Sequence, residues 1–428
     1  MATYLFITLA ATLIMGFPIW AAMATSSFVA ITLGSNMPVI VIVQRLFTAT
    51  DSFPLLAIPL FMVAGNLMSA GGMSRRIIEF CKALIGHVDG GLSMVAVLAT
   101  MMFASVSGSG PATVAAIGGL MIPAMIAAGY DKGYSAALMS IAGAIGIIFP
   151  PSIAKVNFGV TGNVSITALF AAGIGPGIVM GIALMFVCYI TAKKHGYGKN
   201  GAEEFSIANV WRTFKQAFFA LIMPIIILGG IYGGIFTPTE AAAVSVAYGF
   251  FVGVFVYREL SMKDIPQVLM AAGRSTAMVM MLVAAASGFG WIMTAERIPD
   301  AIARFILSLS DNPLVILLII NIFLLIIGCF MEVLASIIIL TPILLPIGVQ
   351  LGVHPVHFGI IMIVNLAISL STPPLGVNLF VACGISKCSI EQVVKKMGFL
   401  LLASIVSLLL TTYFEPIAMT IPRLLGLV

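Results

Sequence analysis

The chain has 428 residues, of which 61% are hydrophobic and 8% are charged, and its mean hydropathy is +1.18. Soluble domains do not have this composition, so the sequence predicts an all-α polytopic membrane protein. The net charge is +5, but the basic residues form no stripe with interleaved aromatic residues, which excludes a nucleic-acid partner. The five cysteines are scattered through apolar segments, which indicates packing residues rather than a disulfide framework.

Long apolar segments, separated by short polar stretches, make up most of the chain. In chain order they cover residues 2–22, 27–46, 54–70, 92–128, 134–171, 173–192, 217–235, 238–257, 276–294, 313–350, 357–386 and 396–416. No Lys or Arg precedes the first of them, which favours a first membrane helix over a cleaved signal peptide. Stretches 72–88, 203–219 and 258–275 are amphipathic and predict helices in the interface plane, with plain solvated loops as the alternative.

The segment 92–128 is interrupted at its middle by Ser107-Gly108-Ser109-Gly110-Pro111. Each arm is about half of the ~20 residues that a membrane-spanning helix needs. Glycine frees the backbone and proline removes a donor, so the interruption predicts a helical hairpin that turns near mid-membrane and leaves by the side it entered. Such broken backbone is tolerated only where protein buries it or where it lines a cavity, and it is typical of transporter binding sites.

The basic residues predict the orientation of the chain. If both hairpin-like segments, 92–128 and 313–350, are re-entrant, 15 of the 20 Lys and Arg fall in one set of loops and four in the other. The richer loops are 71–91, 129–133, 193–216, 258–275 and 387–396. By the positive-inside rule these loops are cytoplasmic and both termini lie outside.

An internal repeat relates the two halves of the chain. A shift of 223 positions places Pro150-Pro151 on Pro373-Pro374 and the first hairpin tip on Phe330–Leu334, the turn of the segment 313–350. The first hairpin starts from the cytoplasm and the second from outside, so the repeats are predicted to be inverted. Inverted repeats place substrate and ion sites at their interface near the midplane.

Both proline pairs interrupt otherwise apolar segments, 134–171 and 357–386. Proline disfavours helix in the preceding residue and cannot donate a hydrogen bond, so each break frees carbonyls before it and amides after it. Freed carbonyls suit Na⁺, and the positive starts of helices suit a carboxylate. The alternative for each break is a proline kink that binds nothing.

Few polar residues lie at membrane depth, where they are expensive. Glu332, in the second hairpin turn, is predicted to hold a cation, or else to cap the helix that follows. Lys155 could meet an anionic substrate, pair with Glu332, or extend toward water. Asn157 and Asn378 follow the two breaks and suit substrate recognition, or they cap freed backbone.

Eight stretches of the sequence resemble a known family. The stretches that carry the resemblance are 59–77 (PLFMVAGNLMSAGGMSRRI), 86–92 (GHVDGGL), 107–118, 123–130, 148–153 (IFPPSI), 169–177 (LFAAGIGPG), 233–243 (GGIFTPTEAAA) and 371–378. Together they cover essentially the whole chain and resemble the large membrane subunit of tripartite ATP-independent periplasmic (TRAP) transporters. The variant SGSGPAT at the first tip is most similar to the sialic-acid branch. Many family members have Ala after SGS, and often Asp where Glu332 stands.

The resemblance implies a fold similar to that of divalent anion–sodium symporters, with a scaffold and a two-hairpin transport domain that moves as an elevator. It implies Na⁺ as the coupling ion and no other cofactor, a bacterial inner membrane, and two partners: a small four-helix membrane subunit, expected as a separate chain, and a periplasmic substrate-binding protein. The implied units are 1–91 (scaffold and interfacial arm), 92–192 (first transport half), 193–216 (cytoplasmic linker), 217–311 (second scaffold and arm) and 312–428 (second transport half with the final helix).

By this analogy the chain imports an acidic solute, with sialic acid as the first candidate and a C4-dicarboxylate as the alternative. The expected sodium ligands are Ser107, Gly108, Ser109, Gly110, Thr113, Ile148, Glu332, Ser336, Ser369, Thr372 and Gly376. The expected substrate ligands are Lys155, Asn157, Ser152, Thr161 and Asn378.

Other functional classes remain open at this stage. They are a channel with re-entrant filter loops, an intramembrane enzyme that uses Ser107 or His residues, and a scaffold that only docks partners. No residue is placed by sequence to activate that serine, and no Walker loop, nucleophile elbow or HExxH motif is present. No transition-metal site is therefore expected, and an ATP-driven pump is unsupported within this chain.

Overall fold

The computed structural model describes residues 1–197, 205–374 and 376–428, and every regular element in these ranges is helical. The helices before residue 196 are α1 (Ala2–Ile14), α2 (Ile19–Gly34), α3 (Ile40–Thr48), η1 (Phe53–Leu56), α4 (Ala57–Ala70), α5 (Met73–Ile85), α6 (Gly91–Ser107), α7 (Gly110–Thr113), η2 (Val114–Gly118), α8 (Gly119–Ala127), α9 (Lys132–Ala142), α10 (Ile145–Ile148), α11 (Ile153–Gly162), α12 (Ile166–Ala172) and α13 (Ile174–His195). The later helices are α14 (Ile207–Tyr232), α15 (Pro238–Phe251), η3 (Val252–Val256), α16 (Ile265–Ala295), α17 (Ile298–Leu307), α18 (Pro313–Gly328), α19 (Val333–Gln350), α20 (Pro355–Ser369), α21 (Val377–Ser386), α22 (Ile390–Tyr413) and α23 (Pro416–Leu424).

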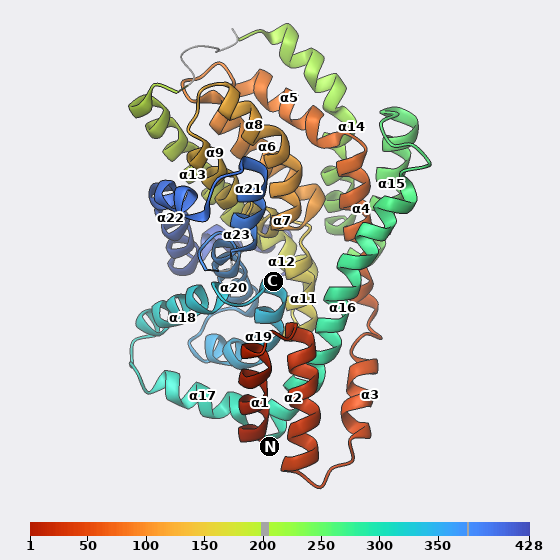
Figure 1. Ribbon diagram of the computed structural model, residues 1–428, viewed down its shortest axis with the longest axis vertical. Helices are drawn as coiled ribbons and strands as arrows, with labels where there is room; N and C mark the ends of the chain where they lie inside the picture. Colours follow the sequence, from red (N-terminus) through yellow and green to blue (C-terminus); the bar gives the residue numbers. More distant parts are fainter. Residues whose placement is uncertain (198–204, 375) are drawn as a thin grey trace.

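Within the described residues, eight helices are long and apolar enough to cross a membrane, or nine if the bent pair α9–α10 and α11 counts as one. In Figure 1, α5, α6 and α8 lie in the upper half of the molecule, whereas α17, α18 and α19 lie in the lower half. The 31-residue helix α16 runs diagonally along one side and joins the two ends. The chain is therefore a multi-span helical membrane protein.

The prediction of one membrane helix over 2–22 is wrong. Helix α1 ends at Ile14, Gly16 adopts a φ of +81°, and α2 begins at Ile19 after Pro18. The two helices pack against each other. They rise about 20 and 24 Å, less than the ~30 Å thickness of a hydrocarbon core. The predicted span 27–46 is likewise divided, because α2 ends at Gly34 and α3 begins at Ile40.

The polar stretches differ from the prediction in two of three cases. The stretch 72–88 forms the separate helix α5, as expected. Most of 203–219 instead belongs to α14, and the second half of 258–275 belongs to α16, so separate interfacial helices there are wrong; residues 203 and 204 lie outside the described part. The alternative of plain loops holds for 258–264, which is turn and loop, and is wrong for the rest, because the apolar residues that follow extend each helix.

The helices are interrupted at both predicted hairpin turns and at both predicted proline breaks. Helices α6 to α8 cover 92–128, and α18 and α19 cover 313–350. The segment 134–171 is broken between α10 and α11 with a bend of 45°, and the segment 357–386 is broken between α20 and α21. Each break contains a cis Pro–Pro peptide bond. The predicted final helix 396–416 corresponds to α22, which is followed by the short α23.

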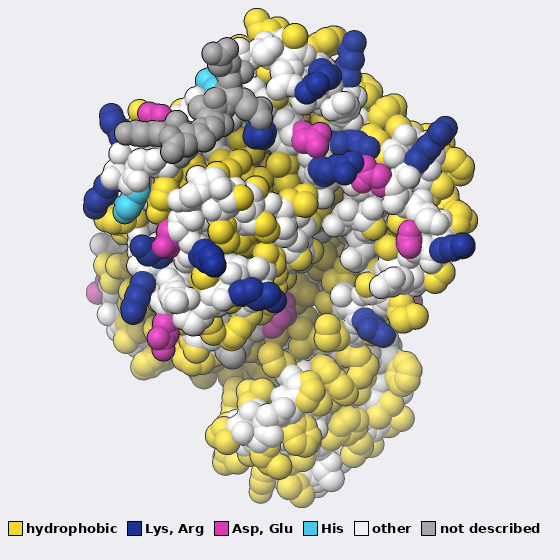
Figure 2. All heavy atoms as spheres, turned by 45° about the horizontal axis from the view of Figure 1, so that its top comes forward, with side chains coloured by type: hydrophobic (Ala, Val, Ile, Leu, Met, Phe, Trp, Pro, Cys, Tyr) yellow, Lys and Arg dark blue, Asp and Glu magenta, His cyan; other side chains and the backbone are white. Residues whose placement is uncertain are grey.

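Basic side chains gather at one end of the molecule. Figure 2 brings the top of Figure 1 forward and shows Lys and Arg spread over that end, whereas the lower lobe in this view is mainly hydrophobic. Arg75 and Arg76 lie there, and both contact Glu259, at 2.6 and 2.7 Å. The amino group of Met1 lies 3.5 Å from Glu296, the residue that follows the C-terminal end of α16. The asymmetry matches the loop charges from which orientation is predicted.

Candidate functional site

The two hairpin tips, the two proline breaks and the α1–α2 turn meet around one cavity of about 550 Å³. It lies between α16, on one side, and both hairpins, on the other. The lining residues are Pro18, Ile19, Trp20, Met62, Gly108, Ser109, Pro111, Ile147, Ile153, Ala154, Ser275, Met278, Val279, Leu282, Glu332, Val333, Leu334, Leu370 and Val377. Among these lining residues, all of which the structure describes, Glu332 carries the only charge.

The first hairpin tip turns because its residues cannot continue a helix. Helix α6 ends where Gly108 adopts a φ of +61°, and α7 begins one residue beyond the extended Ser109. The hydroxyl groups of Ser107 and Thr113 lie 2.7 Å apart, and Thr113 Oγ1 donates to the carbonyl of Ser109 at 2.7 Å. The tip is therefore braced by its own hydroxyls, and three expected sodium ligands lie within one small cluster.

Gly108 also brings the tip against the first break. A Cβ at this position would lie 2.8 Å from the carbonyl oxygen of Pro151. The amide of Ile153, the first residue of α11, donates to the carbonyl of Gly108 at 3.4 Å. Only glycine combines a positive φ with this close approach, so the tip and the break fit together as one unit.

The second hairpin tip is built on a carboxylate cap. Glu332 is the N-cap of α19, and its Oε2 accepts hydrogen bonds from the amides of Leu334 at 2.8 Å and Ala335 at 3.1 Å. Its side chain is exposed to the cavity. The capping role considered from the sequence is confirmed, and the same carboxylate also gives the cavity its negative charge. Ser336 donates to the carbonyl of Glu332 at 3.0 Å and so stabilises the first turn.

Two glycines in the breaks face pairs of oxygen atoms. A Cβ on Gly146 would lie 2.6 Å from Thr113 Oγ1 and 2.8 Å from the carbonyl of Ser109. A Cβ on Gly376 would lie 2.8 Å from the carbonyls of both Leu370 and Thr372. The carbonyl of Ser109 also accepts from the amide and the hydroxyl of Thr113, and the carbonyl of Leu370 accepts from the amide of Asn378. Oxygen atoms are thus grouped beside each break, and such hard ligands suit an alkali cation.

The buried amide of Asn378 adds a further oxygen at the first tip. A Cβ on Gly110 would lie 3.1 Å from both Asn378 Oδ1 and the carbonyl of Gly143. Asn378 Nδ2 donates to the carbonyl of Ser140 at 3.3 Å, whereas Asn378 Oδ1 has no hydrogen-bond partner among the described residues. A fully buried acceptor without a donor is costly and is satisfied when a cation approaches it. Asn378, expected at the substrate, thus lies among the expected sodium ligands.

The remaining expected ligands of the second site lie where α18 meets the second break. Ser369 donates to the carbonyl of Asn365 at 3.0 Å, and Thr372 donates to the carbonyl of Ser369 at 2.8 Å. Thr372 Oγ1 also lies 3.1 Å from Cys329 Sγ, at the end of α18. The second hairpin therefore contacts its own break, but the carboxylate of Glu332 makes no hydrogen bond to Ser369 or Thr372.

Lys155 does not line the cavity. Its side chain is fully buried in α11, and its Nζ donates to the carbonyl of Ile148, the last residue of α10. A Cβ on Gly173 would overlap Nζ, which shows how tightly the chain encloses it. The expected substrate residue Lys155 and the expected sodium ligand Ile148 therefore satisfy each other, and neither the described ion pairs nor the hydrogen bonds join Lys155 to Glu332.

The other expected substrate residues are spread around the first break. Asn157 donates to the carbonyl of Leu334 at 3.3 Å and so ties α11 to the second tip. Ser152 is buried with its hydroxyl unpartnered among the described residues. Thr161 lies half-buried near the end of α11 and does not line the cavity. Their part in substrate binding stays a prediction.

Sequence reasoning missed two walls of the cavity. One is the α1–α2 turn with Trp20, for which the Gly16-Phe17-Pro18 sequence is the only signal within the apolar segment 2–22. The other is the face of α16 formed by Ser275, Val279 and Leu282. This spacing is ordinary for a helix in a membrane protein, so no pattern in the sequence marks it.

Residues 6–417 match the family described as "Tripartite ATP-independent periplasmic transporter, DctM component". The large permease protein DctM for C4-dicarboxylate from Rhodobacter capsulatus is 38% identical over the whole of both chains. The sialic acid large permease protein SiaM from Vibrio cholerae is 39% identical over 89% of each chain. The isethionate permease protein DctMQ from Oleidesulfovibrio alaskensis is 47% identical over 95% of this chain, which spans 64% of that relative's length.

Solved structures share the fold at low sequence identity. The YdaH transporter from Alcanivorax borkumensis superposes with a TM-score of 0.62 over 88% of each chain, at 14% identity. The Neisseria gonorrhoeae protein MtrF gives a TM-score of 0.57 over 87% of this chain, at 12% identity. At these identities the similarity concerns the fold alone.

Proposed function

Since the chain belongs to the DctM component family of TRAP transporters and is thus a large permease subunit, we propose that it imports a small organic anion together with Na⁺. The observation that carries this proposal is the cavity in which both hairpin tips and both breaks meet. It offers oxygen donors to a cation and space for a solute at the same place, which is the arrangement that ion-coupled transport requires.

The sodium ions are proposed to lie at the two breaks. At the first break, the oxygens of Ser109, Thr113 and Gly143 would hold the ion, with the unpartnered Oδ1 of Asn378 as a further ligand. At the second, the carbonyls of Leu370 and Thr372 beside Gly376 would do so. The ion supplies positive charge, and the chain's own oxygens replace its hydration shell.

The charge of the cavity supports coupling. No described lining residue is basic, and the single charged one, Glu332, is acidic. Two like charges about 4 Å apart repel by roughly 4 kcal/mol at an effective dielectric constant near 20. An anionic solute would therefore be repelled unless cations enter with it, so sodium binding and solute binding should favour each other.

The relatives suggest which solutes to test. Their names refer to isethionate, C4-dicarboxylate and sialic acid, all of them small organic anions. We keep sialic acid as the first candidate because of the SGSGPAT sequence at the first tip, with a C4-dicarboxylate and isethionate as its competitors. The proposal also includes an elevator movement of the hairpins, a bacterial inner membrane with both termini outside, and two partners: a small membrane subunit and a periplasmic binding protein.

The test is uptake into proteoliposomes that contain this chain with the small subunit, with the binding protein added outside. Radiolabelled sialic acid, succinate and isethionate would be compared with and without an inward sodium gradient. We expect saturable uptake of one of these anions that stops when K⁺ replaces Na⁺. Uptake that ignores the sodium gradient would overturn the coupling, and non-saturable flux would indicate a channel.

A further inference from the structure

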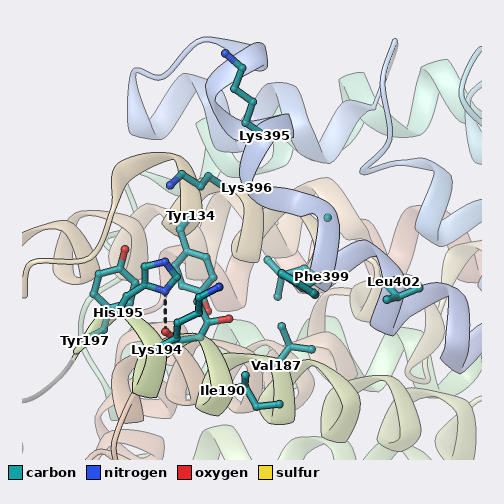
Figure 3. A pocket seen from close by; sticks show the side chains of 13 residues that line it. Tyr134, Val187, Ile190, Lys194, His195, Tyr197, Lys395, Lys396, Phe399 and Leu402 are labelled. Atoms are coloured by element: carbon teal, nitrogen blue, oxygen red, sulfur yellow. Dashed lines mark hydrogen bonds between the residues drawn. The ribbon is translucent and has the colours of Figure 1, made fainter.

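A second cavity, of about 670 Å³, lies outside the transport site, between the end of α13 and the start of α22. Tyr134 of α9 and Tyr197, just beyond α13, complete its wall. Figure 3 shows that its side chains separate by type: Lys194, His195 and Lys396 lie near one another at one end, whereas Val187, Ile190, Phe399 and Leu402 lie toward the other. The cavity is therefore amphipathic.

The polar end is basic. Lys194 has no hydrogen bond or ion pair within the described residues, and Lys396 has only a contact of 4.0 Å with Asp131, which does not line the cavity. None of the described lining residues is acidic. Two ammonium groups with so little neutralisation suit an anionic group of small size, such as a phosphate.

The aromatic rings fix the floor of this end. Tyr197 stacks on Tyr130 at 4.7 Å and on Tyr134 at 5.9 Å, and His195 stacks on Tyr197 at 5.5 Å. Tyr130 and Tyr134 are buried, so the stack gives the basic end of the cavity a wall held in place by the protein interior.

The apolar end faces outward rather than into the protein. Phe399, Leu402 and Ile190 are 72, 56 and 49% exposed. They lie on α22 and α13, two helices that are long and apolar enough to span a membrane. In a multi-span protein such side chains contact acyl chains, so this end is continuous with the bilayer.

We propose that this cavity is a binding site for one anionic phospholipid. The phosphate lies between Lys194 and Lys396 beside His195, and an acyl chain follows the groove along Ile190, Phe399 and Leu402. A zwitterionic lipid would leave the basic charges uncompensated, and a soluble phosphate would not use the apolar end. Basic pockets between membrane helices on the cytoplasmic side are known to favour anionic headgroups, and the loops that contain these lysines are the ones predicted to be cytoplasmic.

The test is lipid retention by the full-length chain, measured by native mass spectrometry in a neutral detergent. Phosphatidylglycerol and phosphatidylcholine with the same acyl chains would be titrated in parallel. We expect preferential retention of phosphatidylglycerol. The double variant Lys194→Gln/Lys396→Gln should weaken it about 30-fold, since each basic residue near a membrane surface is worth about fivefold.

Two control variants separate the site from general charge. Lys193→Gln/Lys263→Gln removes the same charge at positions that do not line the cavity, and it should leave retention unchanged. Asp131→Asn removes the carboxylate near Lys396 but keeps the oxygen that caps α9 at the amide of Tyr134. It should leave retention unchanged or increase it, which shows that the loss in the double variant does not come from breaking that ion pair.

Further measurements distinguish a phospholipid from a soluble phosphate compound as the ligand. The double variant Phe399→Ala/Leu402→Ala should weaken the retention of phosphatidylglycerol, while the protein should still retain phosphatidylglycerol better than phosphatidylcholine. Inorganic phosphate and glycerol 3-phosphate at millimolar concentration should not displace the lipid. Displacement by either, equal retention of the two lipids, or an equal effect of the two double lysine variants would overturn the proposal. Because the readout is lipid mass, the result does not depend on the proposed transport activity.

Discussion

Replacing Gly108 with alanine tests whether the first tip must fit against the first break. Gly108 has a φ of +61°, and a Cβ there would lie 2.8 Å from the carbonyl of Pro151. The left-handed conformation costs an alanine about 1–2 kcal/mol. The contact is also 0.6 Å closer than the 3.4 Å at which ordinary contacts begin, so the tip must move away from the break or change its backbone.

The expected size of the effect follows from these terms. If the fit of the tip against the break loses about 2 kcal/mol, the ratio of tips that fit the break to tips that have moved away falls ~30-fold. The hydrogen bond from the Ile153 amide to the Gly108 carbonyl, already 3.4 Å long, would be lost first. Sodium-dependent uptake should therefore fall by about 30-fold, whereas most of the protein, which is far from the tip, should remain folded.

The assay is initial-rate uptake in proteoliposomes at matched protein content, with size-exclusion chromatography as the check of folding. Gly119→Ala is the matched control, because Gly119 is helical and a Cβ there meets no atom within 4 Å. Alanine at that position should be neutral or stabilise the helix by up to about 1 kcal/mol. Uptake by Gly108→Ala equal to that of Gly119→Ala would refute the close fit between tip and break.

Three further substitutions test neighbouring contacts. Glu332→Gln keeps an oxygen for the cap at the Leu334 amide but removes the charge, so the Hill coefficient for Na⁺ should fall in uptake assays; an unchanged sodium dependence would remove Glu332 from ion coupling. Asn157→Leu removes the side-chain hydrogen bond that ties α11 to the Leu334 carbonyl of α19 and should slow uptake several-fold, which a rate equal to wild type would contradict. Lys155→Met leaves the Ile148 carbonyl unpaired at a cost of about 1–3 kcal/mol, so thermal unfolding in detergent should shift to lower temperature, and no shift would show that the bond contributes nothing.

The hairpins and breaks were predictable because their residues act locally. The run Ser107–Pro111 and the two Pro–Pro pairs forbid a straight helix whatever surrounds them. The prediction of one helix over the first apolar segment is wrong for the opposite reason. Hydropathy over 2–22 is uniform, and the single break at Gly16 to Pro18 was outweighed by the length of the run.

The candidate site could be predicted only in part, since a sequence gives residue types but not directions. Glu332 was placed at the second tip correctly, with its cap and its charge both foreseen. Lys155 follows the first break as expected, but its helical position turns it away from the cavity toward Ile148, and only the packing around Gly173 shows this. Asn378 lies at the opposite break in the sequence and reaches the first tip through the fold alone.

The face of α16 that lines the cavity has a use in experiments. Ser275, Val279 and Leu282 follow one another along one face of α16, and seven residues of a helix rise about 10 Å. Single cysteines at these three positions can each be paired with a cysteine at position 109 of the first hairpin tip. If the hairpin slides along α16 during transport, the cysteine at position 109 should cross-link first to one of these positions and then to the next. The known spacing of the three positions would then give the distance that the hairpin moves in the membrane.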